Sequence, residues 1–337
     1  MKTVLIGMGC IGGTVATMAN EKGFKIDVVE AFPESAKLIK EEGFILTGAL
    51  GNHQVKMNTY ADIDELDNDY DICIIATKYQ QMPAVAERML PHIKPDSLVV
   101  CMQNGICIDS LAEVVGADRA VGCMIGFGAT KMGLNKVEVS SGGEFYIGML
   151  SGRRPQKLEY IRDILNSVLP TKICDNIKER LYSKLIINSC INALAGITGK
   201  PLGDFVDDKT ARHTFLAIAR EGMNVAKAMR IKVPKYGALL EYRALMLGNA
   251  RWYNACCSFV VLIVSRVNGK VKPSTLQSLE KGLKTEIDIM NGLISSFGKE
   301  YNVPTPVNDR LTAMIKEIEN GERKMCIENL REFDCYR

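Results

Sequence analysis

The chain has 337 residues, and its 42 Lys and Arg against 39 Asp and Glu leave a formal net charge of only +3. This length accommodates two domains with substantial cores, and the balanced charge, without a basic block, argues against nucleic acid as a partner. Eleven cysteines without a CxxC pair and three scattered histidines predict buried thiols in a reducing compartment and no metal site. We therefore expect an enzyme that acts on a small molecule.

The first thirty residues read as a strand, a glycine-rich turn, a helix and a second strand. An apolar strand over 2–6 precedes a GxGxxG motif, Gly7-Met8-Gly9-Cys10-Ile11-Gly12, and the second strand ends on Glu30. Glycines in this pattern permit a tight turn, let the backbone approach a pyrophosphate and let the helix pack on the strand. Because a carboxylate about 20 residues beyond the motif suits the ribose hydroxyls, the segment predicts a dinucleotide-binding βαβ unit.

Polar residues follow the next predicted strands. The pattern predicts a helix over 33–42, buried strands over 71–76 and 97–102, antiparallel additions to the sheet within 120–149, a helix over 158–167 and a short strand over 169–174. Lys78 follows the first of the buried strands and Asn104 the second. Since ligands of open α/β sheets bind at the carboxyl ends of strands, Gly9, Glu30, Lys78 and Asn104 should share one edge.

The pattern becomes helical from residue 176, so we expect a dinucleotide-binding domain over 1–175 and a helical domain over 176–337. A helix beginning near residue 178 carries Lys184, Asn188 and Asn192 at intervals of four within an apolar run. These intervals place three polar groups on one stripe, and a buried lysine needs a partner or a function. A second helix is predicted from Ser274 through Gly292, and its Glu286 could supply the counter-charge for Lys184.

The most apolar window, 255–264, is about half as long as a membrane-spanning helix. It lies in the segment 247–272, which also contains Trp252 and the pair Cys256-Cys257. We expect this window to be buried either in the helical core or in a homodimer contact. The glycines after residue 6 argue against a signal peptide, so no membrane association and a cytoplasmic location are expected.

With these motifs in this order, the chain resembles the ketopantoate reductase (2-dehydropantoate 2-reductase) family over nearly its whole length. The matching pieces are the glycine motif, Lys78, Gln103-Asn104-Gly105, the Lys184-Asn188-Asn192 stripe, Ser274, the run Thr285-Glu286-Ile287-Asp288, and Asn291-Gly292. The resemblance implies a Rossmann-type, doubly wound α/β domain followed by an all-helical domain similar to the C-terminal domain of 6-phosphogluconate dehydrogenase.

The resemblance also implies a reaction, in which NAD(P)H reduces the ketone of a 2-oxo acid such as 2-dehydropantoate to give pantoate. Lys184 would be the general acid and Glu286 its electrostatic partner and a substrate contact, while Asn188, Asn192 and Ser274 would bind the substrate. Lys78 and Asn104 would hold cofactor and substrate at the Rossmann edge. A lysine suits this chemistry, because an ammonium both stabilises and protonates the developing oxyanion without a metal.

Two features set this chain apart from the family pattern. Family members commonly use NADPH and place an arginine after the second strand, where this chain has Val29-Glu30-Ala31-Phe32-Pro33, so we expect NADH to be favoured over NADPH. The segment 247–272 is also longer than in compact members.

Two alternatives stay open. One is a β-hydroxyacid dehydrogenase, which would place Asn three residues after the lysine, where this chain has Ile187. The other is a non-catalytic dinucleotide sensor, which has no need for the polar set on the two predicted helices.

Overall fold

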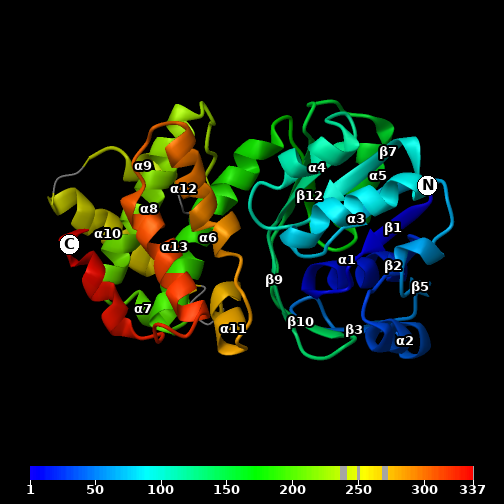
Figure 1. Cartoon of the computed structure of the whole chain (residues 1–337), viewed down its shortest axis with the longest axis horizontal. Coiled ribbons are helices and arrows are strands. Elements are labelled where there is room, and N and C mark those ends of the chain that lie inside the picture. The colour runs from blue at the N-terminus through cyan, green and yellow to red at the C-terminus, as the bar shows by residue number, and fades with distance from the viewer. Residues whose placement is uncertain (236–240, 249–250, 268–271, 337) are drawn as a thin grey trace. The chain divides into compact units, whose positions relative to one another are not determined.

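The computed structural model describes residues 1–235, 241–248, 251–267 and 272–336, and the chain forms two compact units, Met1–Leu181 and Tyr182–Arg337. The first is an α/β unit, and the described part of the second is helical (Figure 1). The units divide within helix α6 (Ile177–Thr198), a few residues beyond the expected boundary. The first turn of α6 belongs to the sheet unit, because Ile177 packs against Gly122 and Gly148 of two strands.

An eight-stranded sheet forms the core of the first unit, in the order β12-β11-β8-β7-β6-β1-β2-β5. Its strands are β1 (Thr3–Ile6), β2 (Ile26–Val29), β5 (Thr59–Tyr60), β6 (Tyr70–Ile75), β7 (Ile93–Cys101), β8 (Ala120–Ile125), β11 (Phe145–Met149) and β12 (Thr171–Ile173). The six adjacent strands β8, β7, β6, β1, β2 and β5 are parallel, whereas β11 runs antiparallel to β8. Helices α1 (Cys10–Glu21), α2 (Pro33–Glu42), α3 (Met82–Met89), α4 (Ile108–Val115) and α5 (Gln156–Asn166) accompany them. The doubly wound α/β fold is thereby confirmed.

A second, four-stranded sheet was not expected. It contains β3 (Phe44–Gly48), β4 (His53–Val55), β9 (Gly128–Lys131) and β10 (Lys136–Ser141), in the order β4-β3-β10-β9. The expected antiparallel addition to the main sheet is therefore correct for β11 and wrong for β10, which pairs in parallel with β3. The reason is visible in β10, where buried Val137 and Val139 alternate with exposed Lys136 and Glu138. Such a strand has one solvent-facing side, unlike the fully buried strands of the main sheet.

The described helices of the second unit are α6, α7 (Leu202–Phe205), α8 (Lys209–Ala228), α9 (Tyr242–Leu245), α10 (Arg251–Val267), α11 (Ser274–Glu280), α12 (Asn291–Glu300) and α13 (Pro306–Glu319), with the 3-10 turns η4 (Ile287–Ile289) and η5 (Ile327–Tyr336). The single helix expected from Ser274 through Gly292 is wrong, because α11 ends at Glu280. Gly282 has a φ of +66°, and the Leu283 N–H donates to the Ser278 carbonyl at 2.9 Å. This is the Schellman-type ending that glycine favours.

Helix α10 covers the whole apolar window, but within 255–263 it is buried on one side only. Cys257, Ser258 and Val261 are buried, while the opposite side exposes Ala255, Cys256, Phe259, Val260 and Ile263. Burial of the whole window within the helical core is therefore wrong. The side chain of Trp252 and residues 268–271 lie outside the described part of the chain.

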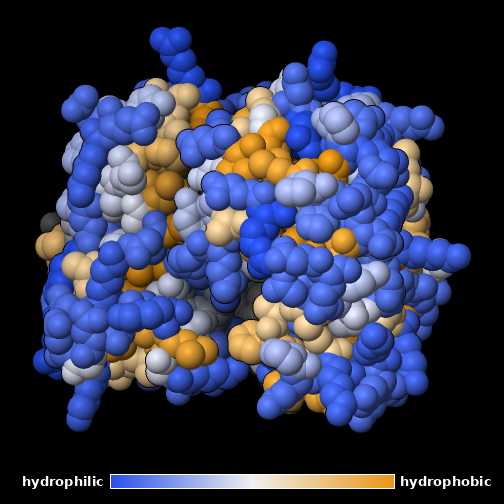
Figure 2. Space-filling model, turned by 45° about the vertical axis from the view of Figure 1, so that its right-hand side comes forward, coloured by the Kyte–Doolittle hydropathy of each residue, from blue (hydrophilic) through white to orange (hydrophobic). Residues whose placement is uncertain are grey.

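Hydrophilic residues predominate on the face drawn in Figure 2, and hydrophobic ones gather there in small separate patches. Among the described residues, no helix combines the length and the apolar character that a bilayer crossing requires.

A buried polar network connects four helices of the second unit. The carboxylate of Glu221 on α8 accepts the N–H groups of Val307 (2.9 Å) and Asn308 (3.0 Å) at the start of α13, and the Asn308 side-chain amide (2.7 Å). The amide of Asn291 on α12 donates to Asn308 (3.0 Å) and to the Ser189 carbonyl of α6 (3.2 Å). Burial raises the pKa of the Glu221 carboxyl, while the three hydrogen bonds oppose the rise. The network thereby attaches α6, which carries the polar stripe, to the other three helices.

Replacement of Glu221 tests this network. Glu221→Ala should lower the free energy of unfolding by about 3 kcal/mol, because it leaves two N–H groups and a buried amide without their acceptor. Urea denaturation monitored by circular dichroism measures the change. Glu300→Ala, at an exposed position at the end of α12, is the control. Equal losses in the two variants would contradict the role of Glu221.

Candidate functional site

The three glycines of the GxGxxG motif have different surroundings. Gly7 has a φ of +99°, and a Cβ at Gly12 would lie 2.0 Å from the Gly7 carbonyl oxygen, so both positions are closed by protein atoms. A Cβ at Gly9 would meet nothing within 4 Å. Helix α1 begins beside this open position, without an acidic residue in its first turn and without a side-chain cap. Its N–H groups therefore remain suited to phosphate oxygens, and the loop fits a dinucleotide pyrophosphate.

Glu30 follows β2, and its carboxylate is turned toward the glycine loop. The side chain is 5% exposed, Oε2 accepts the Met8 N–H at 3.1 Å, and Oε1 accepts the Phe32 N–H at 3.1 Å. These bonds hold a negative charge beside the motif. A carboxylate has about four acceptor positions, so lone pairs remain for ribose hydroxyls.

The other predicted cofactor residues follow neighbouring strands. Because β2, β1, β6 and β7 are adjacent and parallel, Glu30, the glycine loop, Lys78 and Asn104 lie along the same edge of the sheet. Lys78 is exposed, directly before the 3-10 turn η2 (Tyr79–Gln81), and Asn104 is half-buried.

Gln103 was missed as a site-building residue, although it belongs to the Gln103-Asn104-Gly105 turn. Its buried amide donates to the carbonyls of Ile75 (2.9 Å) and Thr77 (3.0 Å) and so fixes the backbone that leads to Lys78. The signal available in the sequence was an amide placed directly after a buried strand.

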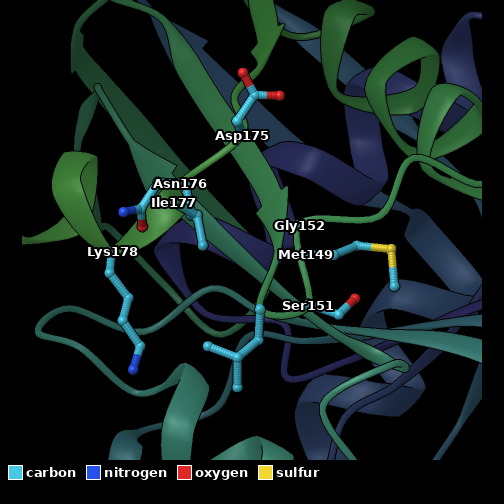
Figure 3. A pocket seen from close by; sticks show the side chains of 8 residues that line it. Met149, Ser151, Gly152, Asp175, Asn176, Ile177 and Lys178 are labelled. Atoms are coloured by element: carbon cyan, nitrogen blue, oxygen red, sulfur yellow. The ribbon is translucent and has the colours of Figure 1, made fainter.

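A cavity of about 340 Å³ in the first unit lies elsewhere. Its walls come from the end of β11 and the start of α6, and include Met149, Ser151, Asp175 and Lys178 (Figure 3). Met149 pairs with Val121 near the beginning of β8, so the cavity is at the sheet edge opposite to the glycine loop. Asp175 pairs with Arg154 and Lys178 with Asp109, each at 2.6 Å, so these charged groups already have partners. We do not assign the cavity to the cofactor.

Helix α6 presents the predicted polar stripe. From Leu181 to Asn192 the half-buried residues are Lys184, Asn188 and Ile191, and every other residue of this stretch is buried. The lysine and the first asparagine are thus the polar groups that a largely buried helix keeps accessible.

Asn192 and Ser274 lie in direct contact. Asn192 Oδ1 accepts the Ser274 hydroxyl at 3.1 Å and the Thr275 N–H at 3.3 Å, while its amide group donates to the Asn188 carbonyl at 3.1 Å. Asn192 therefore caps the start of α11, and Ser274 remains exposed beside it. The pattern of residues did not predict this capping role.

Glu286 is half-buried and directly precedes η4. Helix α12 follows η4 and is anchored to α6 through the bond from Asn291 to the Ser189 carbonyl. The candidate substrate residues on α6, at Ser274 and at Glu286 belong to the helical unit, whereas the candidate cofactor residues, together with Asn104 as the remaining substrate candidate, belong to the sheet unit.

Comparison with known proteins agrees with this arrangement. A family model described as ketopantoate reductase PanE/ApbA matches residues 3–152, and its C-terminal counterpart matches residues 176–319. The 2-dehydropantoate 2-reductase of Pyrococcus abyssi is 27% identical over 330 residues, covering 96% of this chain and all of the relative. That of Aquifex aeolicus is 24% identical, covering 94% and 96%.

Solved structures show the same fold. A PanE/ApbA family ketopantoate reductase from Ralstonia eutropha matches with a TM-score of 0.80 at 23% identity, covering 96% of this chain and 100% of the other. A D-mandelate dehydrogenase in complex with NADH and anilino(oxo)acetate matches with a TM-score of 0.80 at 24% identity, covering 95% and 99%. Because the two family models together span most of the chain, this protein is an oxidoreductase that belongs to the ketopantoate reductase family.

Proposed function

We propose that the protein uses NAD(P)H to reduce the ketone of a 2-oxo acid, converting 2-dehydropantoate into pantoate. The observation that carries this proposal is the stripe on α6, where Lys184 and Asn188 stay half-buried while nearly all neighbouring side chains are buried. The relatives named 2-dehydropantoate 2-reductase, which span nearly the whole chain, support it.

In the proposed mechanism, Lys184 supplies the proton. A reduced nicotinamide held at the glycine loop would supply a hydride for the carbonyl carbon, so that negative charge would develop on the carbonyl oxygen. The Lys184 ammonium stabilises that charge and transfers a proton from Nζ to the oxygen. Its half-buried setting strengthens the attraction relative to bulk water. Glu286 favours the charged lysine and contacts the substrate.

Asn188, Asn192 and Ser274 hold the substrate in this proposal. The hydroxyl hydrogen of Ser274 is directed to Asn192 Oδ1, which leaves the Ser274 oxygen free to accept a hydrogen bond. Such an acceptor suits a substrate that carries a hydroxyl, as 2-dehydropantoate does. Asn192 then acts by holding Ser274 in place, and Asn188 supplies an amide on the accessible side of α6.

Glu30 sets the cofactor preference in this proposal. Its carboxylate is fixed beside the glycine loop by the N–H groups of Met8 and Phe32. A 2′-phosphate on the adenosine ribose would add negative charge close to it. A carboxylate and a phosphate in near contact repel by a few kcal/mol near a protein surface. NADH, which lacks the 2′-phosphate, is therefore favoured.

The exposed side of α10 is proposed as a homodimer contact. Ala255, Phe259 and Ile263 repeat at intervals of four and form one uncharged stripe, flanked by Cys256 and Val260. Phe259 is 62% exposed and Ile263 50% exposed. A continuous apolar stripe is complementary to a second copy of itself related by a twofold axis. A dimeric ketopantoate reductase from Staphylococcus aureus shares the fold, with a TM-score of 0.70.

A panel of 2-oxo acids, assayed with NADH by loss of absorbance of the reduced nicotinamide, tests the reaction. The panel contains 2-dehydropantoate, 2-oxo acids of similar size without its hydroxyl, and the aromatic 2-oxo acid that corresponds to mandelate. The highest kcat/KM should belong to 2-dehydropantoate. Absence of turnover with every member would overturn the proposed function, and a clear preference for the aromatic acid would overturn the assigned substrate.

Lys184→Ala should lower kcat by about 10² to 10⁴, because the variant loses a positioned proton donor. Cofactor binding, measured by fluorescence titration, should stay within about twofold, since Lys184 acts on the substrate oxygen. Lys178→Ala, at the second residue of the same helix, is the matched control and should leave kcat unchanged. Near-normal turnover of Lys184→Ala would refute the assignment.

Glu30→Gln removes the charge beside the glycine loop and preserves the size of the side chain. It should shift the ratio of kcat/KM for NADH to that for NADPH by about tenfold toward NADPH. Glu34→Gln, at an exposed position in the first turn of α2, is the control. The role of Glu30 is disproved if the wild-type protein favours NADPH and the ratio does not respond to Glu30→Gln.

Phe259→Glu should dissociate the dimer, because the twofold axis brings two buried carboxylates close together. Sedimentation equilibrium should show dimers for the wild type and a dissociation constant at least about tenfold higher for the variant. Leu90→Glu places the same charge at an exposed apolar position of the other unit and should leave the assembly unchanged. A monomeric wild type would contradict the proposed contact.

A further inference from the structure

An exposed aromatic ring stands two residues beyond Glu30. Phe32 is 68% exposed, yet its backbone is fixed, since its N–H donates to Glu30 Oε1 at 3.1 Å and Pro33 begins helix α2 directly after it. The ring is therefore presented to solvent from a rigid position at the end of β2. This is the sheet edge that also carries the glycine loop.

A lysine from the second sheet approaches this ring. Lys131 Nζ, at the end of β9, lies 6.0 Å from the centroid of the Phe32 ring, the outer limit of a cation–π contact. Lys131 is half-buried, and in the described part of the chain no carboxylate lies within ion-pair distance of it. A cation without a carboxylate partner and an exposed aromatic face thus stand side by side.

The turn that follows Lys131 is fixed to the rest of the sheet unit. The buried Ser35 hydroxyl on α2 donates to the Leu134 carbonyl at 2.8 Å. The Asn135 amide donates to the Gly43 carbonyl at 2.8 Å, and the Asn135 carbonyl accepts the Ile45 N–H at 2.8 Å. These bonds connect the β9–β10 turn to both ends of α2, so the backbone at Lys131 is held close to the backbone at Phe32.

We infer that Phe32 and Lys131 bind the adenosine end of the nicotinamide cofactor, with Lys131 as the residue that recognises a 2′-phosphate. The inference rests on the proposed cofactor. An exposed aromatic face next to the ribose-binding carboxylate can stack on adenine. An ammonium beside that ring is a suitable partner for a phosphate on the adjacent ribose. Residues 29–33, which directly follow or end the second strand, contain no cation that could take this role.

The two charges at this position oppose each other. Glu30 is buried and fixed by two N–H groups, whereas Lys131 is half-buried on a flexible side chain. Glu30 penalises the 2′-phosphate, and Lys131 offsets part of that penalty. The protein should consequently prefer NADH but retain use of NADPH, and loss of Lys131 should widen the preference.

Binding of two cofactor fragments tests the inference without catalysis. Isothermal titration calorimetry should compare AMP with adenosine 2′,5′-bisphosphate, which differ by the 2′-phosphate alone. Lys131→Ala should weaken binding of the bisphosphate about tenfold, since one charge-assisted contact is lost, and should change the affinity for AMP less than about twofold. Phe32→Ala should weaken the binding of both fragments about tenfold. Phe32→Tyr should bind both with wild-type affinity, because the stacking face is kept.

Lys37→Ala is the matched control, since Lys37 is an exposed lysine on α2 and the nearest other candidate in the sequence. Equal effects of Lys131→Ala on both fragments, no effect on either, or a selective loss in Lys37→Ala would each overturn the role of Lys131. Unchanged affinities in Phe32→Ala would overturn the role of Phe32. Because the fragments contain no nicotinamide, failure of the proposed 2-oxo acid reduction would leave these affinities unaffected and would appear only in turnover assays.

Discussion

Burial of helix α6 is the constraint on which the helical unit depends. In a helix enclosed on nearly all sides, polar groups gain stability from partners within the protein, because an unpaired buried donor or acceptor costs about 1–3 kcal/mol. Two groups of α6 form hydrogen bonds to the starts of other helices. The Ser189 carbonyl accepts the amide of Asn291 at the start of α12, and Asn192 caps the start of α11. The segments that carry Glu286 and Ser274 are therefore attached to the helix that carries Lys184.

The sheet unit solves a different problem, which is to leave backbone N–H groups accessible without destabilising the loop that holds them. Of the three motif glycines, Gly7 and Gly12 are closed against neighbouring backbone and side chains, and Gly9 faces open space. The Met8 N–H, which lies between them, is satisfied by Glu30. One carboxylate thus stabilises the loop and also imposes a charge on whatever ligand the loop receives.

Features set by local spacing were predictable, and features set by distant pairing were not. The glycine motif, helix α2 and the stripe of Lys184 and Asn188 follow from patterns of a few residues, and the structure contains all three. The parallel pairing of β10 with β3 joins residues about ninety positions apart, which periodicity does not specify. Lys131 became a candidate for the cofactor site only through that pairing. The end of α11 was predicted wrongly although its cause is local, because Gly282 adopts the left-handed conformation that ends a helix.

The identity of the substrate is less constrained by the fold than the type of reaction is. The fold is shared with proteins named for different substrates, so the fold by itself selects none of them. In the proposed mechanism, Lys184 would protonate the reduced oxygen of any 2-oxo acid that reaches it. Discrimination must therefore come from groups that meet the remainder of the substrate, and a buried or oriented acceptor rejects an analogue that lacks the matching hydroxyl far more strongly than an apolar wall does. Ser274 donates its hydrogen to Asn192, so in the proposed function it would be such an oriented acceptor, and the choice of substrate would be made at the junction of α6 and α11.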